Sequence, residues 1–374
     1  MIQETNMINK DAKIVTPNSM FKSIDYQGIM AETGTHITYM AYYQNIVAYT
    51  KPYFGVKNTK TYFDRSQITL KKIQHFVKFF SNRNISNNHM QLHNSLVATT
   101  EKDIMHLTRN SINLSNTVKG TNKQVIEVKN PKCLDYDRGS SLLVTTNKHN
   151  AVIYNTELKK HSLNTKFYPN DDVIGRMSFN YHDSKPFVTV IGNHFDNYIW
   201  DPESENISYK FQTTQFANDI DYNENKQIFA AALDETHIDL IDVRDKGKPL
   251  FQSLQGHMDY NFAVKFMGEN YLASGGQDLT TRIWDIRSNK PLHVIKTSRY
   301  GIYSLRYSKV KKTLIALEGF MNFSSYYFDG SDVYGVTDVL LGEMTGIALT
   351  PSEKYFYVGT FHIKPGVAKF ELCH

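Results

Sequence analysis

A repeat with a period near 43 residues runs through most of the chain and limits the folds open to it. Short apolar runs end in an aromatic or aliphatic residue that is followed by a small polar or acidic one. Seven such endings occur, at Leu114-Ser115, Tyr154-Asn155, Trp200-Asp201, Ile241-Asp242, Trp284-Asp285, Phe328-Asp329 and Phe370-Glu371. Successive endings are 40, 46, 41, 43, 44 and 42 residues apart. A period kept over six intervals indicates one supersecondary unit repeated within a single large domain.

Each repeat contains three or four candidate β-strands. A second apolar run precedes each of the last six endings, in SLLVTT, PFVTVIG, IFAAAL, YLASGG, TLIALEG and YFYVGT. Short strands at this period, with Asn, Asp, Ser and Gly between them, are typical of propeller blades. An irregular β-sandwich is the alternative, but sandwiches do not keep one period over six intervals. We therefore predict an all-β, seven-bladed β-propeller.

The composition agrees with one β-rich domain. Of the 374 residues 41% are hydrophobic, enough to bury a core, and the 24 Tyr and 22 Phe favour sheet over helix. The net charge of +5 is far below the basic excess of proteins that wrap nucleic acid, which makes a nucleic-acid partner unlikely. Two cysteines, Cys133 and Cys373, cannot build a disulfide framework. Because no apolar signal or membrane-spanning segment occurs, we expect a reducing compartment, the cytoplasm or the nucleus.

The last repeat lacks a fourth strand, since the chain ends directly after the third. An N-terminal strand would cover that open edge and close the ring. SQITLKK at 66–72 fits because it is short, β-branched and directly ahead of the first repeat. We therefore divide the chain into an N-terminal extension at 1–60, partly disordered, and a propeller at 61–374.

An eight-bladed ring is the alternative. It takes HITYMAYY, NIVAYT and TKTYFDR as an additional blade that ends at Phe63-Asp64, with residues 12–16 as the closing strand. The interval from Phe63 to Leu114 is 51 residues, longer than any other interval in the series. Seven blades are therefore preferred.

The best-formed repeat resembles the WD40 family. It carries Gly256-His257 and, 27 residues after the histidine, Trp284-Asp285. The resemblance implies a hydrogen-bonded network of four side chains: His257, Ser274, Asp278 and Trp284. In that network the indole donates to the serine, the serine bonds the histidine, and the histidine bonds the aspartate of a tight turn. Such a network satisfies buried polar groups at the blade edge and fixes the turn.

The other repeats keep only parts of this pattern. The repeat around Trp200 keeps Trp-Asp, the repeat around Ile241 keeps the aspartate, and others keep only the spacing, so the resemblance covers residues 85–374. In addition, HMQLHNSL at 89–96 resembles the His-Trp-Gln-Leu-Arg stretch that opens the propeller in some fungal WD-repeat proteins of poorly defined function. Its second and fifth residues depart from that stretch.

Two consecutive repeats end in similar strings, IDVR at 241–244 and WDIR at 284–287. An alternating strand places residues i and i+2 on one face, so each aspartate and arginine would form one polar patch. LASGGQDLTTRIWDIR also resembles the box of WD40 substrate receptors that dock onto cullin-4-type ubiquitin ligases, apart from a threonine at a usually aliphatic position. The resemblance implies that Asp242, Arg244, Asp285 and Arg287 bind a ligase adaptor. Alternatively, each arginine only pairs with a local acid.

One short stretch, KKIQHFVKFFSNR at 71–83, concentrates basic and aromatic residues. Its basic groups, together with three phenylalanines, could bind RNA or an anionic lipid surface; they are Lys71, Lys72, Lys78 and Arg83. The favoured alternative is a segment that joins blades, in which the phenylalanines pack on the propeller and the basic groups stay solvated.

The sequence carries no familiar catalytic signature. P-loop, dinucleotide-binding, nucleophile-elbow and HExxH motifs are absent, and no His/Cys/Asp cluster has metal-ligand spacing. We therefore expect no enzymatic activity, no cofactor and no metal. Propellers bind partners through loops on a stiff ring, and candidate loop residues include Tyr181, His182, His194 and Tyr260. The prediction is a protein-interaction scaffold, most concretely an adaptor or substrate receptor in a multiprotein complex such as a ubiquitin ligase.

Overall fold

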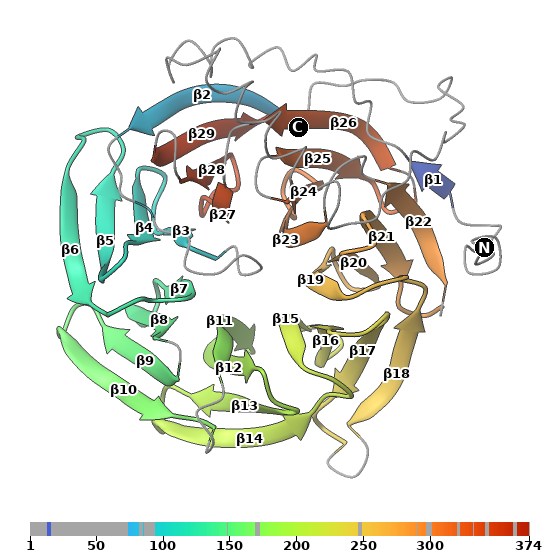
Figure 1. The fold of residues 1–374 in the computed structure, drawn as a ribbon, viewed down its shortest axis with the longest axis horizontal. Helices are drawn as coiled ribbons and strands as arrows, with labels where there is room; N and C mark the ends of the chain where they lie inside the picture. The colour runs from blue at the N-terminus through green and yellow to red at the C-terminus, as the bar shows by residue number, and fades with distance from the viewer. Residues whose placement is uncertain are drawn as a thin grey trace, which may run out of the picture.

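Seven β-sheets are arranged as blades around a central axis (Figure 1). The structure is a computed structural model. It describes residues 13–15, 74–81, 85, 94–147, 149–168, 173–245, 249–288, 290–296, 301–319, 322–331, 333–340, 344–361 and 365–373. Within each blade four strands are antiparallel neighbours, from the innermost strand nearest the axis to the fourth towards the rim. The predicted all-β, seven-bladed propeller is confirmed.

The first four blades follow the chain without interruption. Blade 1 contains β3 (Leu96–Ala98), β4 (Asp103–Leu107), β5 (Ser111–Asn116) and β6 (Asn122–Glu127). Blade 2 contains β7 (Leu134–Asp137), β8 (Leu142–Thr146), β9 (Asn150–Asn155) and β10 (Lys160–Lys166). Blade 3 contains β11 (Ile174–His182), β12 (Lys185–Gly192), β13 (Asp196–Asp201) and β14 (Asn206–Gln212). Blade 4 contains β15 (Ala217–Asn223), β16 (Ile228–Leu233), β17 (His237–Asp242) and β18 (Leu250–Gln255).

Two of the last three blades also take a strand from the N-terminal part of the chain. Blade 5 contains β19 (Asn261–Phe266), β20 (Tyr271–Gly276), β21 (Thr280–Asp285), β22 (Pro291–Lys296) and β1 (Lys13–Val15). Blade 6 contains β23 (Ile302–Ser308), β24 (Thr313–Glu318), β25 (Asn322–Phe328) and β26 (Val333–Leu340). Blade 7 contains β27 (Met344–Leu349), β28 (Tyr355–Thr360), β29 (Gly366–Leu372) and β2 (Gln74–Ser81).

Strand β2 supplies the fourth strand of blade 7 and joins the two ends of the ring. It pairs antiparallel with β29, so that Phe79 lies opposite Ala368 and Phe80 opposite Val367. Gly366 permits this close approach, since a Cβ there would lie 2.5 Å from the carbonyl oxygen of Phe80. The pairing covers the edge of β29 that would otherwise be open.

The closing strand therefore lies further along the chain than predicted. Residues 66–72 are outside the described residues, and the strand that pairs with β29 begins at Gln74. Short length and β-branched residues favoured 66–72, but the closing strand also contributes to the core between blades 6 and 7. Phe79 does so, being 8% exposed in a cluster with Phe370, while Lys78 beside it is exposed. The side chain of Phe79 thus fills part of the core that an open edge of β29 would leave exposed.

Strand β1 does not belong to an eighth blade. It pairs parallel with β22, with Lys13 opposite His293 and Val15 opposite Ile295, as a fifth strand at the rim of blade 5. The eight-bladed alternative, in which residues 12–16 close the ring, is therefore wrong. The other residues of the predicted extension lie outside the described residues, so the division at residue 60 stays a prediction.

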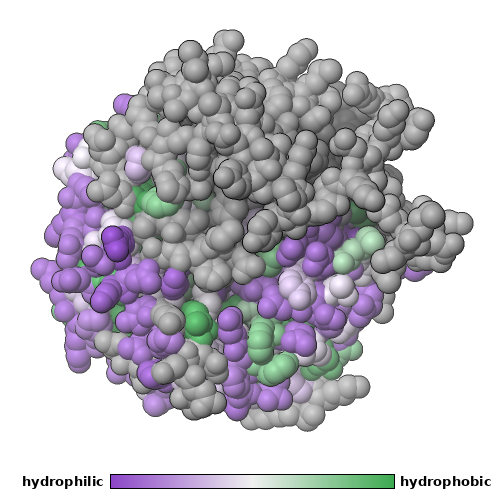
Figure 2. Space-filling model, in the orientation of Figure 1, coloured by the Kyte–Doolittle hydropathy of each residue, from purple (hydrophilic) through white to green (hydrophobic). Residues whose placement is uncertain are grey.

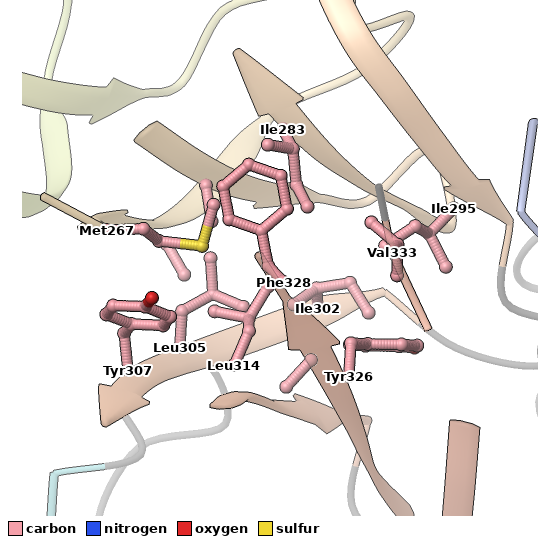
Figure 3. Packing of buried hydrophobic residues seen from close by; sticks show 13 residues of the cluster. Met267, Ile283, Ile295, Ile302, Leu305, Tyr307, Leu314, Tyr326, Phe328 and Val333 are labelled. Carbon is pink, nitrogen blue, oxygen red and sulfur yellow. The ribbon is translucent and has the colours of Figure 1, made fainter. Parts of the chain in front are cut away.

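The core of the described residues is divided into seven apolar layers, each between two neighbouring blades. Figure 3 shows the layer between blades 5 and 6, where Ile283 and Ile295 meet Leu305 and Phe328. The second strand of a blade contributes to the layers on both of its faces; β16, for example, is buried along its whole length. No blade can therefore bury its apolar surface without both neighbours.

Hydrogen bonds between innermost strands hold neighbouring blades in register. The carboxylate of Asp219 on β15 accepts from the backbone N–H of Val264 on β19 at 3.1 Å. Asp135 on β7 accepts from Phe179 on β11 at 2.9 Å in the same way. The partners are 45 and 44 residues apart, about one repeat, so the sequence period corresponds to a direct contact between blades.

The four residues of the expected network meet at one edge of blade 5. Trp284 Nε1 donates to Ser274 Oγ at 2.8 Å, and this hydroxyl lies 2.6 Å from His257 Nε2. His257 Nδ1 lies 2.9 Å from Asp278 Oδ2, in the turn between β20 and β21. These side chains are almost entirely shielded from solvent. The network thus satisfies polar groups that water cannot reach.

Burial and charge determine the protonation states in this network. Burial lowers the pKa of His257, so its neutral ring donates from Nδ1 to Asp278 and accepts the Ser274 proton at Nε2. Burial alone would raise the pKa of Asp278, but hydrogen bonds from His257 and Thr280 and the charge of Arg282 hold that pKa well below its usual value. Asp278 is therefore ionised at neutral pH.

Trp200 on β13 occupies the same position in blade 3 without such a network. On β20, Ser274 lies two residues after the residue that pairs with Trp284. On β12, the residue two positions after the one that pairs with Trp200 is Val190. Valine has no acceptor, and within the described residues the buried indole N–H of Trp200 has no hydrogen-bond partner. Blade 3 thus keeps the apolar packing of the tryptophan and lacks its hydrogen bond.

We predict that Trp284→Ala lowers the free energy of unfolding by about 3–5 kcal/mol, because it removes a fully buried aromatic side chain and a buried hydrogen bond. The matched pair Trp284→Phe and Trp200→Phe separates the two contributions. Only Trp284→Phe loses a hydrogen-bonded N–H. We therefore expect its loss of free energy of unfolding to exceed that of Trp200→Phe by about 1 kcal/mol. Urea unfolding of the full chain measures both, and equal losses for the Phe pair would contradict the stabilising role of the network.

We predict that Phe79→Asp destabilises the ring by more than about 3 kcal/mol, because it removes a buried ring and places a carboxylate between blades 6 and 7. The adjacent variant Lys78→Asp is the control. Its side chain is exposed, so we expect a change within about 0.5 kcal/mol. Similar urea midpoints for the two variants would show that β2 does not close the ring.

Candidate functional site

The Asp-x-Arg motifs of blades 4 and 5 have the same local geometry. In each motif the arginine Nε donates to one carboxylate oxygen at 2.8 Å and Nη2 donates to the other at 2.5 Å. The arginine backbone N–H also donates to the carboxylate, at 3.0 Å. Asp242 with Arg244 and Asp285 with Arg287 are thus two equivalent bidentate pairs on neighbouring blades.

These pairs form through a turn and not, as expected, along an alternating strand. Strand β17 ends at Asp242 and β21 ends at Asp285, so each arginine belongs to the turn that follows. The short aspartate side chain accepts from the N–H two residues on, which bends the chain and returns the guanidinium to the carboxylate. Hydrogen bonds from Arg244 and Arg287 lower the pKa of both aspartates, so the pairs are ionised at neutral pH.

Both arginines line one pocket of about 350 Å³ between blades 4 and 5. Its apolar surface comes from Ile228, Phe251 and Ile286, of which Phe251 is 49% exposed. The whole lining consists of Lys226, Ile228, Asp242, Arg244, Asp245, Phe251, Ile286 and Arg287. Two motifs that are one repeat apart in the sequence therefore contribute to a single site, which we call the Asp–Arg pocket.

The Asp–Arg pocket suits an apolar side chain that is flanked by a carboxylate. Nε and Nη2 of each arginine are used by its aspartate, while Nη1 of Arg244 and of Arg287 has no hydrogen-bond partner within the described residues. Lys226 is paired with Glu269 at 3.0 Å. An acidic group can bind to the two available guanidinium edges while an apolar group covers Phe251.

The sequence pointed to the two pairs but not to the apolar wall beside them. Phe251 lies on β18, the rim strand of blade 4, while Ile286 lies in a turn of blade 5. Whether these two side chains line the same pocket depends on how blades 4 and 5 pack. A local sequence pattern does not specify that packing. One signal was available, because the middle residues of the two motifs, Val243 and Ile286, are apolar residues in otherwise polar turns.

The basic stretch at 71–83 is only partly described. Lys71, Lys72 and Arg83 lie outside the described residues. Lys78 is exposed on β2, with its Nζ 5.7 Å from the centre of the Phe80 ring. This described part of the stretch is a strand of blade 7, and not the segment between blades that the favoured alternative expected. Whether the stretch binds RNA or lipid stays a prediction.

Apolar side chains on the face seen in Figure 2 lie in small groups between mostly hydrophilic ones, as far as the described residues show. In the described part of the chain no helix is long and apolar enough to cross a membrane. The same part contains no group of three or more His, Cys, Asp or Glu side chains that could hold a metal ion.

No family model matches this chain. Over 62 residues it is 40% identical to the THO complex subunit 6 homolog of Danio rerio, which is 16% of this chain and 19% of that protein. Over 162 residues it is 23% identical to a WD repeat-containing protein of Dictyostelium discoideum, which is 42% of this chain and 9% of that protein. The chain therefore spans less than a fifth of the length of either curated relative.

The fold recurs among solved structures. A chain of the crystal structure of the mitotic checkpoint complex matches with a TM-score of 0.68, over 85% of this chain and 99% of that one, at 14% sequence identity. At this identity the likeness shows the fold alone. Seven blades, the network from His257 to Trp284 and the WD-repeat relative agree with one another. The chain is a WD40-repeat β-propeller protein.

Proposed function

We propose that this propeller is a non-catalytic scaffold that joins a multiprotein complex through the Asp–Arg pocket. The observation that carries the proposal is the convergence of two equivalent Asp–Arg turns on one pocket with an apolar wall. Turns on a stiff ring hold their side chains at fixed positions, so little conformational entropy is lost when a partner binds.

The residue types at the pocket are those that anchor protein partners. Arginine and aromatic side chains are enriched among the residues that dominate binding energy. Arg244 and Arg287 are exposed, and each guanidinium is already oriented by its own aspartate. The charge of each arginine is balanced by its own aspartate, so a partner segment is recognised here by hydrogen bonds: an acidic residue can accept from the remaining N–H edges while an apolar residue covers Phe251.

Two features bear on the identity of the complex. The segment similar to a THO complex subunit supports membership of a multiprotein complex and, with it, a nuclear location. A cullin-type ubiquitin ligase adaptor is a more specific candidate partner. Its support is the resemblance of LASGGQDLTTRIWDIR to the docking box, and the relatives found do not add to it.

We predict that the double variant Arg244→Ala/Arg287→Ala loses the main partners of the full chain, because it removes both guanidinium groups from the pocket. Affinity purification of the full chain followed by mass spectrometry measures the loss. Arg138→Ala is the control, an exposed arginine on a turn of blade 2 that does not line the pocket. Partner recovery unchanged in the double variant would refute the proposal.

The same experiment identifies the kind of complex. Arginine-dependent recovery of a cullin adaptor would support the ligase version, whereas arginine-dependent recovery of other complex subunits would support the scaffold and reject that version. Arg244→Lys/Arg287→Lys keeps the charge but not the planar fork. We expect it to lose the partners as well, because an ammonium cannot keep two bonds to its aspartate and offer a further one in the same plane.

A further inference from the structure

A second candidate surface lies on the opposite face of the ring from the Asp–Arg pocket. The pocket residues lie at or near the β15–β16, β17–β18 and β21–β22 turns. Because the strands of a blade alternate in direction, the β12–β13, β14–β15, β16–β17 and β18–β19 connections lie at the other end of the blades. These four connections belong to blades 3, 4 and 5 and are neighbours around the ring.

Two of these connections expose aromatic rings. Phe195, in the β12–β13 connection, is 42% exposed, and Tyr260, in the β18–β19 connection, is 47% exposed. Phe195 also packs against the half-buried Phe216, with ring centres 5.1 Å apart. We call this surface the aromatic–acidic arc and define it by Phe195, Phe216, Asp234, Glu235, Asp259 and Tyr260.

Hydrogen bonds make the arc continuous from blade 3 to blade 5. The backbone N–H of Asp234 donates to the carbonyl of Phe216 at 3.0 Å. Asn218 Nδ2 donates to the Asp234 carboxylate and to the carbonyl of Asn261, both at 2.8 Å. Asn261 Nδ2 in turn donates to the carbonyl of Glu235 at 2.7 Å. The exposed rings are therefore mounted on loops that are tied to one another.

The arc carries unpaired negative charge. Asp234, Glu235 and Asp259 are half-buried, and none forms an ion pair with a basic side chain within the described residues. Basic groups on neighbouring strands are paired with other acids: Lys210 with Asp196 at 2.7 Å, the buried Arg282 with Asp278, and His237 with Asp239 at 3.4 Å. The pKa of His237 is raised chiefly by its hydrogen bond to Asp239 and also by the charge of Glu235. Three carboxylates beside exposed rings thus form a mainly negative surface.

We propose that the aromatic–acidic arc binds an extended basic segment of a second protein. Arginine or lysine side chains of that segment would lie over the rings of Tyr260 and Phe195 and pair with the neighbouring carboxylates. An extended segment fits because the arc crosses three blades. Since the Asp–Arg pocket is on the other face, the propeller can hold an acidic partner segment and a basic one at once.

Panning a phage-displayed library of random dodecapeptides on the full chain tests this proposal. We expect enrichment of peptides with two or more Lys or Arg residues beside an apolar one, and binding that weakens as salt is raised. Tyr260→Ala, and separately Glu235→Gln/Asp259→Asn, should weaken the enriched peptides about tenfold in fluorescence polarisation.

Two controls keep the outcome specific to the arc. Tyr260→Phe keeps the ring face and should leave binding unchanged, and Arg138→Ala should leave it unchanged because Arg138 is an exposed residue in a turn of blade 2, outside the arc. The proposal is overturned if no basic peptide is enriched, or if the enriched basic peptides bind Tyr260→Ala as tightly as they bind the unsubstituted chain. Neither result depends on whether the Asp–Arg pocket binds a complex subunit.

Discussion

Face-to-face packing of neighbouring blades is the interaction on which the rest of the structure depends. Each blade has two apolar faces, so it is stable only with a neighbour on both sides, and an open ring would leave two faces exposed to water. Closure by β2 is therefore part of the core itself: Phe79 enters the layer that also holds Phe323 of blade 6 and Phe370 of blade 7. Hydrogen bonds such as the one that the backbone N–H of Val264 donates to Asp219 fix the register between neighbouring blades.

Packing between blades also explains why the fold forms although most repeats lack the hydrogen-bonded network that blade 5 contains. In blade 5 the indole of Trp284 is buried and bonded; in blade 3 the indole of Trp200 is equally buried and lies beside Val190, without a bonded partner among the described residues. Burying an aromatic side chain contributes several kcal/mol, whereas one hydrogen bond contributes about 1 kcal/mol net. A repeat can therefore keep its place in the fold through its buried apolar residues even when it lacks the hydrogen-bonded network.

A stiff ring separates two kinds of chemistry onto opposite faces. On one face, Arg244 and Arg287 are each oriented by an aspartate and share a pocket with Phe251. On the other, Tyr260 and its neighbours combine exposed rings with unpaired carboxylates. The first surface matches acidic and apolar groups and the second matches basic ones. Under the two proposals, the propeller would hold two different partners on opposite faces of one stiff ring.

The sequence by itself determined the blade count and the third strand of every blade, because a period near 43 residues is kept along the chain, and its resemblance to the WD40 family implied the network around Trp284. The tertiary structure alone decided which segment closes the ring: the sequence predicted 66–72, whereas the strand that pairs with β29 is 74–81, which places Phe79 in the cluster around Phe370. It also decided that two separate Asp-x-Arg turns share one pocket. Contacts of this kind join residues of different blades, and the geometry of the ring, not the local pattern, sets which side chains meet.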